Sequence, residues 1–177
     1  MVDNLKAFDI EFSALSIGKH QYSFEVDDTF FGCFENAVIT NGKLAVKMEL
    51  LRQTTMLQFN FDIDGHITTT CDRCTDDFEW QIHTKETLLV KIGDHLEEED
   101  VDVYVIPQSQ THWNVAQQIY EYICMAKPLR TVHPDDAKGK STCNAAFIAQ
   151  LEKIVTKQTK KTEVDPRWDV LKKINNN

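Results

Sequence analysis

Two cysteines that lie two residues apart, Cys71 and Cys74, are the side chains of this chain best suited to chemistry. A Cys-x-x-Cys pair can bind a metal ion, form a disulfide or exchange thiols. A structural zinc ion takes four ligands, often two from each of two such pairs, and this sequence holds one pair. The remaining ligands would be His133 and Cys143, which share a long polar connection. These four residues are the candidate metal ligands.

The cysteine pair has three interpretations. We favour unliganded cysteines at strand ends, because neither His133 nor Cys143 has a second ligand close to it in the sequence. In the second interpretation the four candidates bind zinc. The third is redox chemistry, which the β-type alternation after Cys74 disfavours, since thioredoxin-like pairs lie at the N-terminus of a helix. We therefore expect no cofactor, with zinc as the alternative.

Catalytic motifs are missing from the sequence. The six histidines are scattered without a His-x-x-x-His spacing, and neither a Gly-x-Ser-x-Gly motif nor a glycine-rich phosphate loop occurs. The acidic run at residues 97–100 is most simply a solvated loop. The sequence therefore predicts a protein that is not an enzyme and has no small-molecule substrate.

Charge is distributed unevenly along the chain, whose net charge is −9. Residues 1–126 hold 8 Lys and Arg against 22 Asp and Glu, whereas residues 127–177 hold 11 against 6. An acidic body with a basic tail is typical of a protein whose tail meets nucleic acid, although a solvated helix and linker would give the same pattern. The candidate nucleic-acid-binding residues are Lys153, Lys157, Lys160, Lys161, Arg167, Lys172 and Lys173.

Period-two alternation of apolar residues predicts the elements that position these groups. It predicts strands at 8–12, 22–26, 44–50, 57–63, 67–71, 78–82, 86–92 and 101–105. Asn41-Gly42 predicts a hairpin turn, Asp64-Gly65 a second turn, and the Phe30, Phe31 and Phe34 cluster is expected under the sheet. Helical spacing follows at 115–126, 144–155 and 165–174, with Asn144 and Asp165 as N-caps.

This order of elements predicts an α+β fold, with an antiparallel sheet or open barrel and two to three C-terminal helices. We expect one domain at 1–155, followed by a basic linker and short terminal helix at 156–177. Trp168 is expected to anchor that helix, although it could instead stack on an unpaired base. No apolar run is long enough to span a membrane, and the N-terminus does not resemble a signal peptide, so we expect a cytoplasmic protein.

Two separated motifs resemble those of one family. Cys71-Asp-Arg-Cys74, followed by Phe78, resembles the Cys-x-Arg-Cys signature of the YceD-like proteins, the large ribosomal RNA subunit accumulation proteins. Asp165-Pro166-Arg167-Trp168, followed by Leu171 and Lys172, resembles the Asp-Pro-Arg-aromatic ending of the same family.

The resemblance implies a non-enzymatic role in accumulation of the large-subunit ribosomal RNA, with that RNA or its assembly proteins as partners. Many members carry extra cysteines after the proline that ends the helix, which suggests a metal site. This chain keeps only Cys143 there, with His133 nearby. The alternative function is a zinc- or thiol-dependent adaptor whose acidic body binds a basic ribosomal protein.

Overall fold

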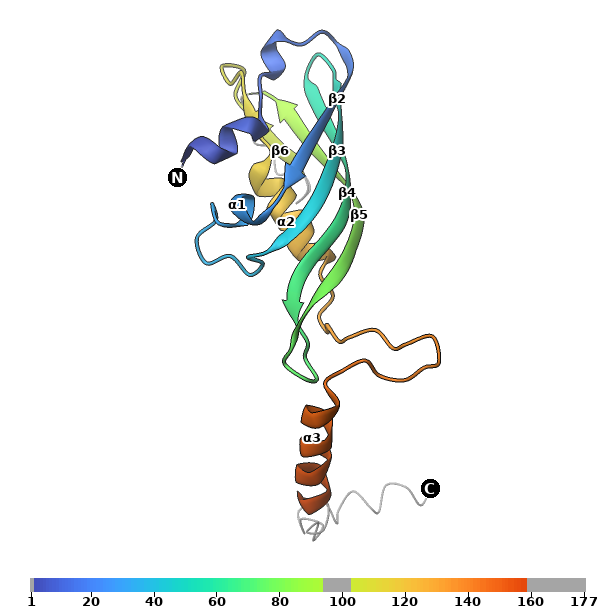
Figure 1. The fold of residues 1–177 in the computed structure, drawn as a ribbon. Helices are drawn as coiled ribbons and strands as arrows, with labels where there is room; N and C mark the ends of the chain where they lie inside the picture. Colours follow the sequence, from blue (N-terminus) through green and yellow to red (C-terminus); the bar gives the residue numbers. More distant parts are fainter. Residues whose placement is uncertain (1, 94–102, 159–177) are drawn as a thin grey trace, which may run out of the picture. The chain divides into compact units, whose positions relative to one another are not determined.

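The computed structural model describes residues 2–93 and 103–158 (Figure 1). The chain divides into two compact units, and we describe each by itself. The first contains residues 1–70 and 77–131, and the second contains residues 71–76 and 132–177. No helix in the described part of the chain is long and apolar enough to cross a membrane.

An open five-stranded sheet dominates the first unit and confirms the predicted α+β class (Figure 1). The first four strands are antiparallel, and the fifth, β6, runs parallel to β5. Their order across the sheet is β2 (Gly18–Val26), β3 (Gly42–Arg52), β4 (Met56–Thr70), β5 (Asp77–Ile92) and β6 (Val103–Ile106).

Alternation along these strands divides the sheet into a buried and an exposed face, as the sequence predicts. In β3, Val46 and Met48 are buried while Lys47 between them is exposed, and β4 repeats the pattern with Phe59 and Phe61. Burying one such side chain contributes about 1.5–3 kcal/mol, so several rows of them form a substantial core.

Helix α2 (Ala116–Ala126) covers the buried face of the sheet, with Ile119 and Ile123 fully buried. Its Tyr122 ring meets Phe61 edge-on at 5.4 Å. The remaining elements of the first unit are short: η1 (Val2–Phe8), η2 (Phe12–Ala14), α1 (Asp28–Phe31), and strands β1 (Asp9–Ile10) and β7 (Trp113–Asn114), which pair with each other. The predicted phenylalanine cluster is confirmed, since Phe30 and Phe31 are buried in the same core.

The second unit contains α3 (Ala145–Gln158), which extends three residues beyond the predicted end. Asn144 caps it as predicted, because its Oδ1 accepts hydrogen bonds from the amides of Ala146 (3.1 Å) and Phe147 (3.3 Å). The predicted terminal helix at 165–174 lies outside the described residues.

Two predicted turns are wrong. The residues before Asn41 do not form a strand, and the Gly42 amide donates to Asp28 Oδ1 at 2.9 Å instead of closing a hairpin. Residues 64 and 65 do not end a strand either, because β4 continues through them and pairs with β5 as far as Thr70. Gly65 permits this with a φ of +150° and no side chain facing β3.

Gly65→Ala should destabilise the first unit, because a Cβ there would lie 2.6 Å from Leu44 Cα while φ stays unfavourable. We expect a loss of about 3 kcal/mol in the free energy of unfolding, measured by urea denaturation. Gly18→Ala is the matched control, since Gly18 also has positive φ (+136°) but open space around it, and should cost about 1 kcal/mol. Equal losses would show that the contact with β3 is unimportant.

Candidate metal centre

The first half of the candidate centre is the knuckle at residues 71–76, which joins β4 to β5. The Cys71 amide donates to the Asp76 carbonyl and the Thr75 amide donates to the Cys71 carbonyl, both at 2.9 Å. Thr75 takes a positive φ of 61° to close the turn. Cys71 and Cys74 are 1% and 0% exposed. The knuckle therefore keeps both cysteines away from solvent.

The second half is a turn within residues 132–144. Asp136 organises it, because its Oδ1 accepts from the amides of Lys138 (2.9 Å) and Lys140 (2.8 Å). Gly139 supplies the positive φ of +73°, and Asp135 pairs with Ser141 in a single antiparallel bridge. The chain therefore doubles back, which returns Cys143 to the neighbourhood of His133.

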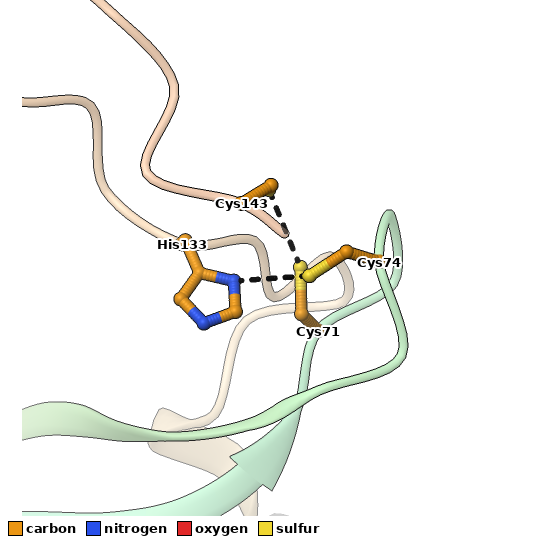
Figure 2. Close-up of side chains that lie close together, drawn as sticks. All are labelled: Cys71, Cys74, His133 and Cys143. Carbon is orange, nitrogen blue, oxygen red and sulfur yellow. Dashed lines mark hydrogen bonds between the residues drawn. The ribbon is translucent and has the colours of Figure 1, made fainter. Parts of the chain in front are cut away.

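The structure brings all four candidate ligands together (Figure 2). Their donor atoms lie within 4.8 Å of one another. The Sγ atoms of Cys71 and Cys143 are 3.8 Å apart, and Cys74 Sγ lies 3.4 Å from His133 Nδ1. Tetrahedral zinc, at about 2.3 Å from sulfur and about 2.0 Å from nitrogen, separates two sulfurs by about 3.8 Å and a sulfur from a nitrogen by about 3.5 Å. The donor set and these two distances therefore fit zinc.

Hydrogen bonds around the cluster tie its two halves together. Arg73 Nη1 donates to Ser141 Oγ at 3.3 Å, and Asn144 Nδ2 donates to Asp76 Oδ2 at 3.1 Å. The Arg73 amide also donates to Cys71 Sγ at 3.4 Å. The arginine of the Cys-x-Arg-Cys motif thus serves this centre twice, through its backbone and through its side chain. Sequence reasoning missed Ser141 and Asn144 as supports, because nothing in their local pattern marks them.

The thiols differ in acidity. Burial opposes ionisation of Cys71, but hydrogen bonds from the amides of Arg73 and Cys74 and contacts with His133 outweigh it and lower its pKa to about 6. For Cys74 burial dominates and, together with the neighbouring sulfurs of Cys71 and Cys143, raises the pKa. A thiolate at one cysteine therefore raises the pKa of the neighbouring thiols. A bound divalent cation would compensate the negative charges and allow several thiols to ionise together.

Thioredoxin-like redox chemistry has little structural support here. In thioredoxin-like proteins a helix N-terminus helps to lower the pKa of the reactive thiol, whereas here strand β5 follows the pair and the lowered pKa of Cys71 comes from backbone amides and His133. The other two cysteines belong to the first unit. Cys33 donates to the Thr29 carbonyl at 3.2 Å, and burial raises the pKa of Cys124. Neither belongs to the cluster.

The predicted nucleic-acid residues are placed only in part. Lys153 and Lys157 lie on α3, and of these the structure describes the side chain of Lys153, which is exposed. The remaining basic candidates and the second family motif lie outside the described residues: Lys160, Lys161, Asp165, Pro166, Arg167, Trp168, Lys172 and Lys173.

These observations define the class of protein: an α+β protein in which a Cys-x-x-Cys knuckle and a distant loop form a Cys₃His cluster. A family model described as large ribosomal RNA subunit accumulation protein YceD matches residues 59–175. The match covers more than half of the chain and includes all four cluster residues, so this chain belongs to the YceD family. No curated protein and no solved structure matches it.

We predict that the protein purified at neutral pH without added metal carries about one equivalent of zinc, because structural zinc survives purification. Cys71→Ser, Cys74→Ser and Cys143→Ser should each lower that content sharply, measured by inductively coupled plasma mass spectrometry. Cys33→Ser and Cys124→Ser remove the same atom outside the cluster and should retain the metal. A metal-free parent protein that is stably folded would contradict the prediction.

Proposed function

We propose that this protein is a non-enzymatic factor that supports accumulation of the large-subunit ribosomal RNA. The family match over residues 59–175 carries the proposal, since the family is named for accumulation of the large ribosomal RNA subunit. The matched segment holds the whole candidate metal centre and most of the basic tail.

A structural role for the metal centre favours a binding factor over an enzyme. Cys71 and Cys74 would hold zinc from the knuckle, and His133 and Cys143 from the loop. Catalytic zinc keeps one coordination position open for water or substrate, whereas four protein ligands close the site. The three sulfurs are also buried, so they offer little access to a substrate. Bound zinc would supply a cross-link between two chain segments.

Direct contact with RNA would come through the basic segment. The acidic part of the chain, residues 1–126, repels phosphate, whereas residues 127–177 carry an excess of lysine and arginine. Within this segment, Lys153 lies on α3 and is exposed. In this proposal the metal centre fixes the N-terminus of α3, and the lysines on α3 and after it neutralise phosphates.

The second candidate is an adaptor that binds a basic ribosomal protein through the acidic body. The exposed face of the sheet favours it, since Asp62, Asp64 and Glu79 all lie there. Lys85 partly offsets this charge, since its Nζ lies 3.4 Å from Asp62 Oδ2. We rank it second for that reason.

Depletion of the protein from cells should lower the ratio of large- to small-subunit ribosomal RNA, measured on total RNA. The parent chain should restore the ratio. A Cys74→Ser/Cys143→Ser variant should not, because it loses two ligands, whereas Cys33→Ser/Cys124→Ser should restore it. An unchanged ratio on depletion would overturn the proposed function. Rescue by the ligand variant would show instead that the metal centre is dispensable for that function.

Replacing Lys157, Lys160 and Lys161 together with Gln should flatten the salt dependence of RNA binding. Each lysine that neutralises a phosphate on single-stranded RNA contributes about 0.7 to the slope, so the loss should be about two units. The matched control replaces Lys43, Lys47 and Lys85, which are exposed on strands of the first unit. Identical binding by both variants at every salt concentration would exclude contact through the tail and favour the adaptor.

A further inference from the structure

Strand β2 is an open edge of the five-stranded sheet (Figure 1). It pairs with β3 along all nine residues from Gly18 to Val26, in a continuous register without a bulge. Within the described part of the chain no strand pairs with its other side. A long, regular edge without proline presents unpaired backbone groups that another strand can meet.

The sequence of β2 is complementary to itself when two copies run antiparallel. The register that pairs all nine residues places Tyr22 opposite Tyr22 of the second copy, Gly18 opposite Val26, and Lys19 opposite Glu25. Residues directly opposite in an antiparallel pair lie on the same face of the sheet. Lys19 and Glu25 both belong to the exposed row of β2. Lys19 of each copy would therefore face Glu25 of the other copy, which gives two ion pairs related by the two-fold axis.

Both charged side chains are available for this contact. Glu25 is exposed, and the Lys19 side chain is 67% exposed while its Nζ donates to Glu49 at 3.0 Å. An ammonium group has three donors, so Lys19 can bridge Glu49 of its own copy and Glu25 of the second copy. The remaining exposed pair in this register, Gln21 opposite Ser23, is polar and uncharged. No like charges face each other anywhere along the register.

We propose that the protein forms a homodimer in which β2 pairs with β2 of a second copy. The contact is isologous, because each copy contributes the same edge. Since both edges are used in one contact, assembly stops at the dimer. It joins two five-stranded sheets into one continuous sheet and satisfies the open edge that each copy would otherwise expose. The proposal is independent of the metal centre and of the proposed function.

Charge reversal tests the register directly, using the full chain in analytical ultracentrifugation. Lys19→Glu sets Glu opposite Glu25 twice, and Glu25→Lys sets Lys opposite Lys19 twice. Each variant alone should therefore dimerise at least tenfold more weakly than the parent. Mixing the two should restore dimerisation, because both charge pairs are opposite again in the heterodimer. The double variant should also dimerise with itself.

Lys47→Glu is the matched control, since Lys47 is exposed on the same face but on β3, one strand away from the edge. It should leave the dimer unchanged, and urea denaturation should show that every variant is folded. A parent protein that stays monomeric at the highest soluble concentration would overturn the proposal. So would a dimer that none of the edge variants weakens, or a mixture that does not associate.

Discussion

A shortage of apolar core is the constraint that governs the second unit. In its described part, the buried side chains are those of Cys71, Cys74 and Cys143, while Phe147 and Ile148 are only half-buried. Burying an aliphatic side chain contributes about 1.5–3 kcal/mol, which cannot offset the chain entropy of ordering such a segment. Structural zinc contributes about 10–16 kcal/mol in small zinc-binding peptides. A metal cross-link is therefore the interaction of the right size to hold this unit.

The knuckle connects two strands that are firmly paired with each other. Strands β4 and β5 pair without interruption from Met56 opposite Lys91 to Thr70 opposite Asp77, so both ends of the knuckle are fixed. Thr70 Oγ1 donates to Asp77 Oδ1 at 2.7 Å at the last pair. The cysteines thus occupy a short turn with few alternative conformations, and ordering them for a metal costs little further entropy.

Sequence reasoning recovered the strands of the five-stranded sheet, α2 and the Asn144 cap, because these follow from local periodicity and capping. The strand expected at 8–12 is only the two residues of β1, with a 3₁₀ helix on each side. It failed at Asn41-Gly42 and Asp64-Gly65, where residues that favour turns have other roles. The Gly42 amide donates to Asp28, and Gly65 lies within β4. Gly65 lets β4 pass close to β3, a requirement set by a neighbour distant in sequence. The four cluster residues could be named, but the spacing gave no reason to expect them together. The missed signal was Asp136 with Gly139, a turn signature that folds the loop back.

The family match begins at residue 59, within β4, so it contains the knuckle and the loop but not β2 or β3. The knuckle and the loop need particular atoms: three sulfurs, an imidazole nitrogen and the groups that orient them. Strands β2 and β3 need only apolar side chains at alternate positions to cover Phe59 and Phe61, and many sequences meet that requirement. The N-terminal strands can therefore differ widely while still completing the core. Strand β2, whose edge carries the proposed dimer contact, lies outside the matched residues.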